Sequence, residues 1–370
     1  AKGDYVVQEV TYVKDESAQK QAELKASVSK SKLHPSVASL LSVIFDLAMI
    51  NKQLSEAGFE IKKIPISKLS TKSITEGYEI LGLLAENVKA KATKAKLEEL
   101  TADFYKLIPH ENENIILDTE QRIKEKIELL DSLKEAQIAF KLCEKQTGAN
   151  AVDHNYKMLK CELSYVEPKS KEYTVIEEYI KNTQEFYNFE IVDLFSLSRD
   201  NEEQRFKTWK ARGNRMLLWY GSRLTNFVGI LSQGLRLPCP EVPNSAFRVG
   251  KGIYLTDMIS KAHNQCFSYA SGGEFCVLLC EAALGEQHEL LHDNLNMHEE
   301  LPHGKHSVLA LGHKAPPKSS YVEIEKGLKV PKGKPENTIF QQSSFIYNEY
   351  LCYNPAQVRL RYLLRMRTGQ

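Results

Sequence analysis

The first third of the chain carries apolar residues at helical spacing. Between residues 33 and 146 they recur every three or four positions in four groups, the pattern of amphipathic helices. Ser73 with Glu76 forms a capping-box pattern, and Asp118 or Thr119 can cap the last group. Four or more such helices with short links predict an all-α bundle. The apolar positions are Val37, Leu40, Leu41, Ile44 and Leu47; Ile74, Tyr78, Leu81, Ala85 and Val88; Leu97, Leu100, Phe104, Leu107 and Ile108; and Ile123, Ile127, Leu130, Leu133 and Phe140.

Two shorter segments precede this helical region. Residues 4–13 alternate loosely between apolar and polar side chains and predict one strand. Residues 14–31 are rich in Lys, Glu, Ser and Ala and predict a linker. We expect the opening residues to be the middle of a longer protein.

The apolar period drops to two after a predicted loop at residues 150–154. Alternation predicts strands at residues 159–165 and 189–197, and an apolar run predicts another at 275–284. Helical patterns lie around residues 175–179 and 258–269. The last two strands, 344–353 and 358–366, are separated by Asn354-Pro355 and predict a hairpin. Strands outnumber helices, so this part is predicted to be α+β with a largely antiparallel sheet.

Between these strands, residues 217–254 read LLWYGSRLTNFVGILSQGLRLPCPEVPNSAFRVGKGIY. The apolar run ending in Trp219 predicts a buried strand that Gly221 ends, and Gly234 suits the end of a short helix. Gly250 and Gly252 precede a second strand. Glycines beside strands let a flat ligand lie against bare backbone, because no Cβ intrudes.

Composition narrows the class of protein. At 370 residues the chain has room for two or three domains, and its net charge of +1 does not demand a nucleic-acid partner. Seven scattered cysteines, an odd number, indicate reduced thiols in an intracellular protein. Cys276 and Cys280 have no further ligands at zinc spacing, so we expect no metal. No membrane span or signal peptide is predicted.

Five separated motifs, in one order, carry a family resemblance. They are Leu-Trp-x-Gly-Ser-Arg, Gly-Ile-Leu-Ser-x-Gly-Leu-Arg, Gly-Lys-Gly-Ile-Tyr, Lys-His-Ser-Val from Lys305, and Tyr-Asn-Glu-Tyr from Tyr347. Together they resemble the catalytic region of the poly(ADP-ribose) polymerase family, of the DNA-dependent type, over roughly the last 215 residues. The sequences KIPISKLS and FYKLIPH resemble the autoinhibitory helical domain of that family. Residues 4–13 resemble the last strand of its WGR module.

The resemblance implies a domain order and a fold. Residues 1–30 would end a WGR-like domain and a linker, and residues 31–150 would form the helical regulatory domain. Residues 151–370 would form an ADP-ribosyltransferase domain of largely antiparallel sheets with short helices.

The resemblance also implies a reaction and its residues. NAD would be the substrate, its nicotinamide would leave, and an acceptor would take the ADP-ribose. Glu349 matches the catalytic glutamate, Tyr254 the tyrosine that stacks on nicotinamide, and Gly221 the glycine whose backbone holds the amide. The alternatives are an exposed strand carboxylate for Glu349 and a core aromatic for Tyr254. Further matches are Ser222 and Arg236 near the adenosine, and Lys251 and Lys261 lining the site, where a solvated lysine is the alternative.

Three positions depart from the family pattern. Tyr220 stands where the family has the histidine that contacts a ribose hydroxyl. Ala262 stands where a serine bonds the nicotinamide amide, and Gln265 where a second tyrosine stacks on the ring. These departures predict impaired NAD binding.

Acceptor and regulatory positions follow from the same resemblance. Phe247 and Arg248 match residues near the incoming acceptor, and the arginine suits the pyrophosphate of a growing chain. Glu128 and Asp131 match acids of the helical domain that face the NAD pocket, with a solvated helix face as the alternative.

Three functional hypotheses remain open at this point. The first is a nuclear NAD-dependent protein ADP-ribosyltransferase of the DNA-damage response, whose acceptors include itself and whose DNA contacts lie outside this sequence. The second is a catalytically silent pseudoenzyme that acts as a scaffold. The third is a reader of NAD or ADP-ribose that binds without transfer.

Overall fold

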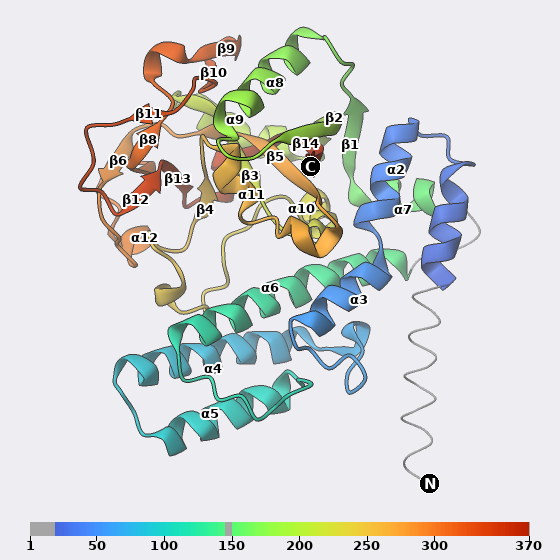
Figure 1. Cartoon of the computed structure of the whole chain (residues 1–370), viewed down its shortest axis with the longest axis vertical. Helices are drawn as coiled ribbons and strands as arrows, with labels where there is room; N and C mark the ends of the chain where they lie inside the picture. Colours follow the sequence, from blue (N-terminus) through green and yellow to red (C-terminus); the bar gives the residue numbers. More distant parts are fainter. Residues whose placement is uncertain (1–18, 145–149, 370) are drawn as a thin grey trace. The chain divides into compact units, whose positions relative to one another are not determined.

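The computed structural model describes residues 19–144 and 150–369 (Figure 1). The chain divides into two compact units. One comprises the chain before Leu159 together with the segment Pro238–Ala246, and the other comprises Leu159–Leu237 and the chain from Phe247 onward.

The first unit is helical, as predicted. Its long helices lie side by side, with α4 against both α5 and α6 and with α3 against α6 (Figure 1). The elements are α2 (Pro35–Ile44), α3 (Leu47–Glu56), η1 (Ile66–Lys68), α4 (Thr71–Lys89), α5 (Lys94–Leu107), α6 (Glu120–Cys143) and α7 (Ala151–Leu159). Sixteen of the twenty predicted apolar positions are buried, among them Leu40, Leu41, Ile44, Tyr78, Leu81, Phe104, Leu130 and Leu133.

One of the two predicted caps is wrong. Helix α4 begins one turn before the expected capping box, because the Ser70 side chain accepts a hydrogen bond from the Ser73 backbone N–H at 2.9 Å. Ser73 therefore lies inside the helix. At α6 the cap is Thr119, whose hydroxyl accepts from the Arg122 N–H at 3.2 Å.

Two predicted irregular segments are also wrong where the structure describes them. Residues 19–28, expected in the linker, are helical, in keeping with the high helix propensity of Ala, Lys, Glu and Gln. The loop expected at residues 150–154 is the start of α7, because Asn150 Oδ1 accepts from the Val152 and Asp153 N–H groups at 3.1 and 3.2 Å. The predicted strand at residues 4–13 lies outside the described residues.

The segment Pro35–Glu56 is long and apolar enough to span a membrane by length and composition alone, which the sequence analysis did not single out. In the structure it is two helices, α2 and α3, separated at Phe45 and Asp46. Their apolar faces are buried in the helical unit, so the segment serves as protein core.

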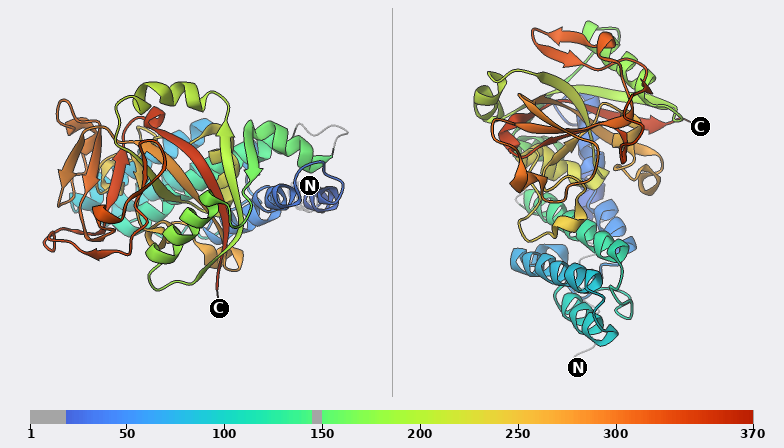
Figure 2. Two further views of the ribbon diagram at one scale, coloured as in Figure 1. Left: turned by 90° about the horizontal axis from the view of Figure 1, so that it is seen from above. Right: turned by 90° about the vertical axis from the view of Figure 1, so that its left-hand side faces the viewer.

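The second unit is built on a seven-stranded sheet. Every neighbouring pair in it is antiparallel except β3 with β10. Figure 2 lets the central run be followed by colour, from green β2 through red β14 to orange β5. The order is β1 (Cys161–Tyr165), β2 (Phe189–Arg199), β14 (Val358–Thr368), β5 (Glu274–Ala283), β3 (Arg215–Gly221), β10 (Leu328–Val330) and β9 (Val322–Glu325).

Two smaller sheets complete this unit, which confirms the α+β class with mostly antiparallel pairing. One has the order β4 (Ile253–Leu255), β13 (Glu349–Cys352), β7 (Ser307–Ala310) and β6 (Gln287–Leu290), and the other β11 (Glu336–Asn337), β8 (Gly312–Ala315) and β12 (Phe345–Tyr347). The helices are α8 (Lys171–Thr183), α9 (Glu202–Lys210), α10 (Phe227–Gln233), α11 (Ile259–His263) and α12 (Met297–Glu300). Trp219 and Thr256 exchange two backbone hydrogen bonds, of 2.8 and 3.1 Å, which join β3 to the end of β4.

The predicted C-terminal hairpin is wrong. Strand β13 pairs with β4 and β7, whereas β14 pairs with β2 and β5, so the two strands lie in different sheets. The 3-10 turn Pro355–Gln357, capped by Asn354, separates them and redirects the chain. The helix predicted at residues 258–269 is shorter than expected and ends at His263.

A buried ion network crosses the large sheet. The Glu281 carboxylate on β5 is fully buried and accepts from Arg215 of β3 and from Arg359 and Arg361 of β14, the last two at 2.7 and 2.6 Å. Burial alone would raise the pKa of Glu281, but the three arginines outweigh it and lower that pKa.

Glu281→Gln is expected to lower the free energy of unfolding by about 3–5 kcal/mol, because it leaves buried arginines without their charge partner. The pKa of Glu281 is lowered in the folded state, so its contribution is present above the ordinary value of 4.5 and is lost as pH falls. Denaturant unfolding at neutral and acidic pH tests both points. The exposed strand glutamate Glu289 supplies the control, Glu289→Gln, expected to change stability by less than about 0.5 kcal/mol. Equal effects of the two substitutions would contradict the role of the network.

Candidate functional site

Helix α11 gathers several of the predicted site residues. Lys261 extends its ammonium group to Glu349 Oε1 on β13. The next residue, Ala262, lies with its backbone against Gly221 at the end of β3. One short helix therefore connects the glycine end of β3 to the carboxylate on β13.

Tyr254 and Glu349 project from the same face of the four-stranded sheet. Strand β4 pairs with β13 so that Tyr254 lies opposite Leu351, two residues from Glu349. Cross-strand partners share a face, and so do residues two apart on one strand. The sequence placed both residues in one site, and this register is compatible with that placement.

The Tyr254 side chain is fixed by the loop before it. Its hydroxyl donates to the Gly250 carbonyl at 2.8 Å and accepts from the Val249 N–H at 3.0 Å. Burial raises its pKa and the charge of Glu349 adds to the rise, so the hydroxyl stays neutral. The Phe247 ring lies nearly parallel to the Tyr254 ring, with centroids 6.5 Å apart.

Two cations face the Glu349 carboxylate, whose side chain is 8% exposed. Besides Lys261, Arg248 NH1 lies 3.9 Å from Glu349 Oε1. Burial lowers the pKa of Lys261, and the adjacent Glu349 charge opposes that shift. Both cations approach the same oxygen, Oε1, which orients the carboxylate.

Arg248 is itself held in place. It forms a two-point pair with Asp293, with distances of 3.1 Å (Nε) and 2.7 Å (NH2), and also donates to the Ser344 carbonyl at 2.9 Å. Its guanidinium carbon lies 4.3 Å above the Phe345 ring. The hydrogen bond and charge of Asp293 raise the pKa of Arg248.

The packing of α11 against β3 leaves room only for glycine at position 221. A Cβ at this position would lie 1.8 Å from the Ala262 carbonyl oxygen and 2.6 Å from its carbon. Both are backbone atoms, so relief of the clash would need α11 to move.

Gly221→Ala is therefore expected to destabilise the second unit by about 1–3 kcal/mol or more and to displace Lys261 from Glu349. Thermal unfolding measures the first effect. The control is Gly82→Ala in helix α4, where the nearest atom would lie at 3.8 Å; helix propensity predicts a neutral or slightly stabilising change there. A Gly221→Ala chain that melts with the parent would show that the close approach is relieved at no cost.

The remaining predicted residues are spread around this centre. Tyr220 lies on β3 beside Gly221 and is partly exposed, while Gln265 follows α11 and is exposed. Ser222 Oγ accepts from Asn226 Nδ2 at 3.1 Å. Two further basic residues are partly exposed: Arg236, which donates to Gln233 at 2.7 Å, and Lys251 in the loop before β4.

In the helical unit, Asp131 accepts a hydrogen bond of 2.5 Å from the hydroxyl of Tyr78. Burial raises the pKa of Tyr78, and the Asp131 charge adds to the rise. Asp131 therefore links α6 to α4. Glu128 lies one turn earlier on α6 and is partly exposed.

Two acids that contact this region were missed by the sequence analysis. Asp293 fixes Arg248, and the fully buried Asp257 contacts both neighbours of Glu349. Asp257 had a usable signal, because it is the one charged residue in the largely apolar stretch IYLTDMI. Asp293 had none, since it lies in a polar loop.

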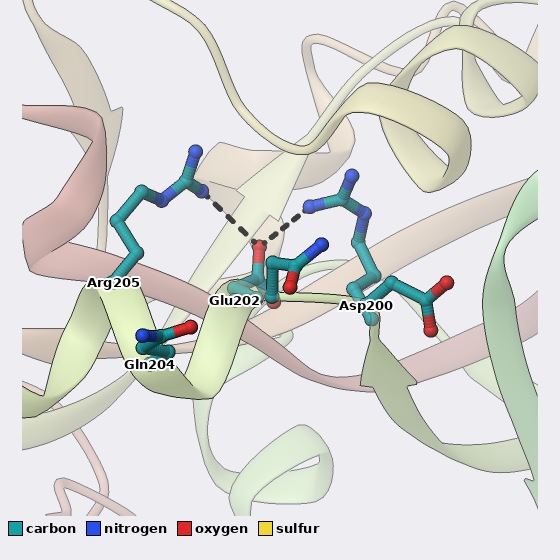
Figure 3. A pocket seen from close by; sticks show the side chains of 6 residues that line it. Asp200, Glu202, Gln204 and Arg205 are labelled. Atoms are coloured by element: carbon teal, nitrogen blue, oxygen red, sulfur yellow. Dashed lines mark hydrogen bonds and ion pairs between the residues drawn. The ribbon is translucent and has the colours of Figure 1, made fainter.

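A separate open cavity of about 330 Å³ lies at the turn between β2 and α9 (Figure 3). Arg199 and Arg205 both reach the Glu202 carboxylate there, at 3.1 and 3.6 Å. Arg199 also donates to the Leu231 and Ser232 carbonyls at the end of α10. Arg199 therefore satisfies carbonyl groups at the end of α10, and Glu202 balances its charge, so these charged residues have a structural role here. Across the described ranges, no group of three or more His, Cys, Asp or Glu side chains could hold a metal ion.

Comparison with known proteins covers both units. Residues 170–368 match the family model of the poly(ADP-ribose) polymerase catalytic domain, and residues 31–157 match the model of the regulatory domain of the same polymerase. Poly [ADP-ribose] polymerase 2-B of Oryza sativa subsp. japonica is 38% identical over 365 residues, which is 95% of this chain and 60% of the rice protein.

Other relatives give the same result. Poly [ADP-ribose] polymerase 2 of Arabidopsis thaliana is 38% identical over 91% of this chain and 54% of its own length. Poly [ADP-ribose] polymerase 1 of Xenopus laevis is 37% identical over 97% of this chain and 37% of its own length. The chain thus spans about half the length of the plant relatives and less of the frog protein. With one family model over more than half of its residues and a second over the helical unit, this chain belongs to the poly(ADP-ribose) polymerase family.

Proposed function

We propose that this chain transfers ADP-ribose from NAD to protein acceptors, including itself, at the face that carries Tyr254 and Glu349. The observation that carries the proposal is the shared face of these two side chains, with Lys261 of α11 directed at the Glu349 carboxylate. A flat aromatic surface and an oriented carboxylate are what the reaction needs from the protein.

The chemistry assigns a task to each group. As nicotinamide leaves, positive charge builds on the ribose, and a fixed carboxylate nearby stabilises it. Glu349 has that role, and it would accept a hydrogen bond from a ribose hydroxyl. Tyr254 would stack on the nicotinamide ring, and the backbone of Gly221 would bind its amide, which orients the leaving group. Ser222 and Arg236 would contact the adenosine part.

The three departures set the expected strength of this activity. The Ala262 methyl group has no hydrogen-bonding atom, and Gln265 offers no aromatic face. Tyr220 is longer than a histidine and would reach the ribose only if the sugar shifts. We infer that NAD binds weakly and that transfer is slow.

A second candidate, favoured by the same three residues, is a silent pseudoenzyme that acts as a scaffold. In either case we extend the proposal, on the family resemblance, to a nuclear protein of the DNA-damage response that senses DNA breaks through other domains. The helical unit would restrain NAD binding.

The test is incubation of the chain with NAD labelled in its adenine part, followed by denaturing electrophoresis. Weak label that survives denaturation would support transfer. Label that is absent at every NAD concentration, from a chain shown to be folded, would contradict transfer and favour the scaffold. NAD bound measurably in calorimetry but never transferred would instead indicate a reader.

A further inference from the structure

A buried carboxylate contacts the strand of Glu349 from its other side. Asp257 is fully buried in the turn between β4 and α11. Its Oδ2 accepts from Asn348 Nδ2 at 2.9 Å and from the Tyr350 hydroxyl at 3.1 Å. Asn348 and Tyr350 are the two neighbours of Glu349, and successive side chains along an extended chain point to opposite faces. Asp257 therefore hydrogen-bonds to the residues on either side of Glu349, on the face of the strand opposite the Glu349 side chain.

Asn348 is held by further hydrogen bonds, one of them from its Nδ2 to the Tyr350 hydroxyl at 3.5 Å. Besides its bond to Asp257, its Oδ1 accepts from the Gly312 N–H at 2.9 Å. Its backbone carbonyl accepts from the Thr256 hydroxyl at 3.0 Å. The side-chain amide of Asn348 and its backbone carbonyl are therefore both hydrogen-bonded. The turn Thr256-Asp257 makes two of these bonds, one through each residue.

This arrangement costs folding stability. The second oxygen, Oδ1, accepts no hydrogen bond from the part of the chain that the structure describes. Burial raises the pKa of Asp257 to about 6, against the opposing hydrogen bonds of Asn348, of Tyr350 and of its own backbone N–H, and against the charge of Lys261. The other ionisable groups that act on it, the hydroxyls of Tyr179 and Tyr321, are neutral and supply no compensating cation. A neutral side chain of similar size would avoid the free-energy cost of removing a charge from water.

We propose that Asp257 is a positioning residue of the transfer reaction, which through Asn348 and Tyr350 holds the Glu349 backbone so that the carboxylate meets Lys261. This inference rests on the proposed function. It offers a reason for a fully buried carboxylate at a position where, among the described residues, no donor reaches its Oδ1.

Stability and activity are then expected to change with pH in opposite directions. The pKa of Asp257 is raised in the folded state, so the folded chain binds its proton more tightly than the unfolded chain. The contribution of Asp257 to stability is therefore largest at acidic pH and is lost as pH rises through about 6. Protonation replaces the two charge-assisted hydrogen bonds to Oδ2 with weaker neutral ones, so transfer should fall as pH drops through the same value.

The decisive variant is Asp257→Asn, compared with the parent chain in both unfolding and label transfer. We expect an unchanged or higher melting temperature at neutral pH and a fall in kcat of about 10-fold or more, with KM for NAD little altered. The acidic limb of the pH profile near 6 should disappear. Tyr350→Phe removes one donor and keeps the ring, so it should lower kcat less. Glu281→Gln is the matched control, expected to lower the melting temperature and leave kcat unchanged.

The outcomes separate the inference from the proposed function. A lower melting temperature with unchanged kcat in Asp257→Asn would show a purely structural role and overturn the inference. A readout without turnover is the side-chain amide resonance of Asn348, which should titrate near pH 6 in the parent chain and not in Asp257→Asn. If the parent transfers nothing, the proposed function fails, while the amide titration still decides whether Asp257 controls Asn348. An Asn348 resonance that stays constant through this range overturns the inference even where transfer is seen.

Discussion

The triple variant Tyr220→His, Ala262→Ser and Gln265→Tyr is expected to bind NAD about 100-fold more tightly than the parent chain. The serine hydroxyl and the histidine contact each add a hydrogen bond of about 0.5–1.5 kcal/mol, and the second tyrosine adds an aromatic contact of similar size. Together these approach about 3 kcal/mol, which corresponds to roughly two orders of magnitude in Kd. Gln265 is exposed and Tyr220 partly so, which leaves room for both new rings. Calorimetry with NAD measures the gain.

The single substitutions should recover less than their shares, because all three groups hold one ligand. Gln265→Leu is the matched control for the ring, since it adds apolar area without an aromatic face. A gain from Gln265→Leu equal to that from Gln265→Tyr would show that stacking is not the source. An unchanged Kd in a folded triple variant would contradict the assignment of these three positions to the NAD site.

Adding Glu349→Gln to the triple variant is expected to lower kcat for transfer by about 10²–10³-fold while NAD still binds. The amide keeps the shape of the side chain but removes the charge that, in the proposed reaction, stabilises the developing positive ribose. It also replaces the ion pair with Lys261 by a weaker hydrogen bond to a neutral amide, so part of the loss comes from a less firmly oriented side chain. Single-turnover label transfer, with calorimetry as the control for binding, measures the effect. Comparable transfer with and without the carboxylate would show that Glu349 lies outside the reacting centre.

The sequence predicted the parts of the fold that depend on local pattern. Apolar spacing located the long helices, because an amphipathic stripe is a property of the helix itself. The alternating run that became β14 was equally readable. Errors at the start of α4 and at residues 150–154 arose where several polar residues compete to cap a helix.

The pairing of the strands was harder to predict from the sequence. The two final strands looked like a hairpin because they are adjacent and alternate, yet they enter different sheets. The partners of β13, which are β4 and β7, come from far earlier in the chain. Nothing local in residues 344–366 indicates those distant partners.

For the candidate site, the sequence named residues but not their supports. Motifs pointed to Gly221, Tyr254 and Glu349. The clash that would follow a Cβ at Gly221 depends on where α11 lies, which only the fold supplies. In the same way, the grip of Asp257 on Asn348 depends on the β4–β13 register, so Asp257 stood out in the sequence only as an isolated charge.

The central claim is that the face carrying Tyr254 and Glu349, beside Gly221, binds the nicotinamide end of NAD. The most direct measurement is a crystal structure of the triple variant with a benzamide-type mimic of nicotinamide. We expect the mimic to lie against the Tyr254 ring, with its amide bonded to the Gly221 backbone and the Glu349 carboxylate beside it. A mimic seated elsewhere, for example in the cavity beside Glu202, with Tyr254 uncontacted, would contradict the account.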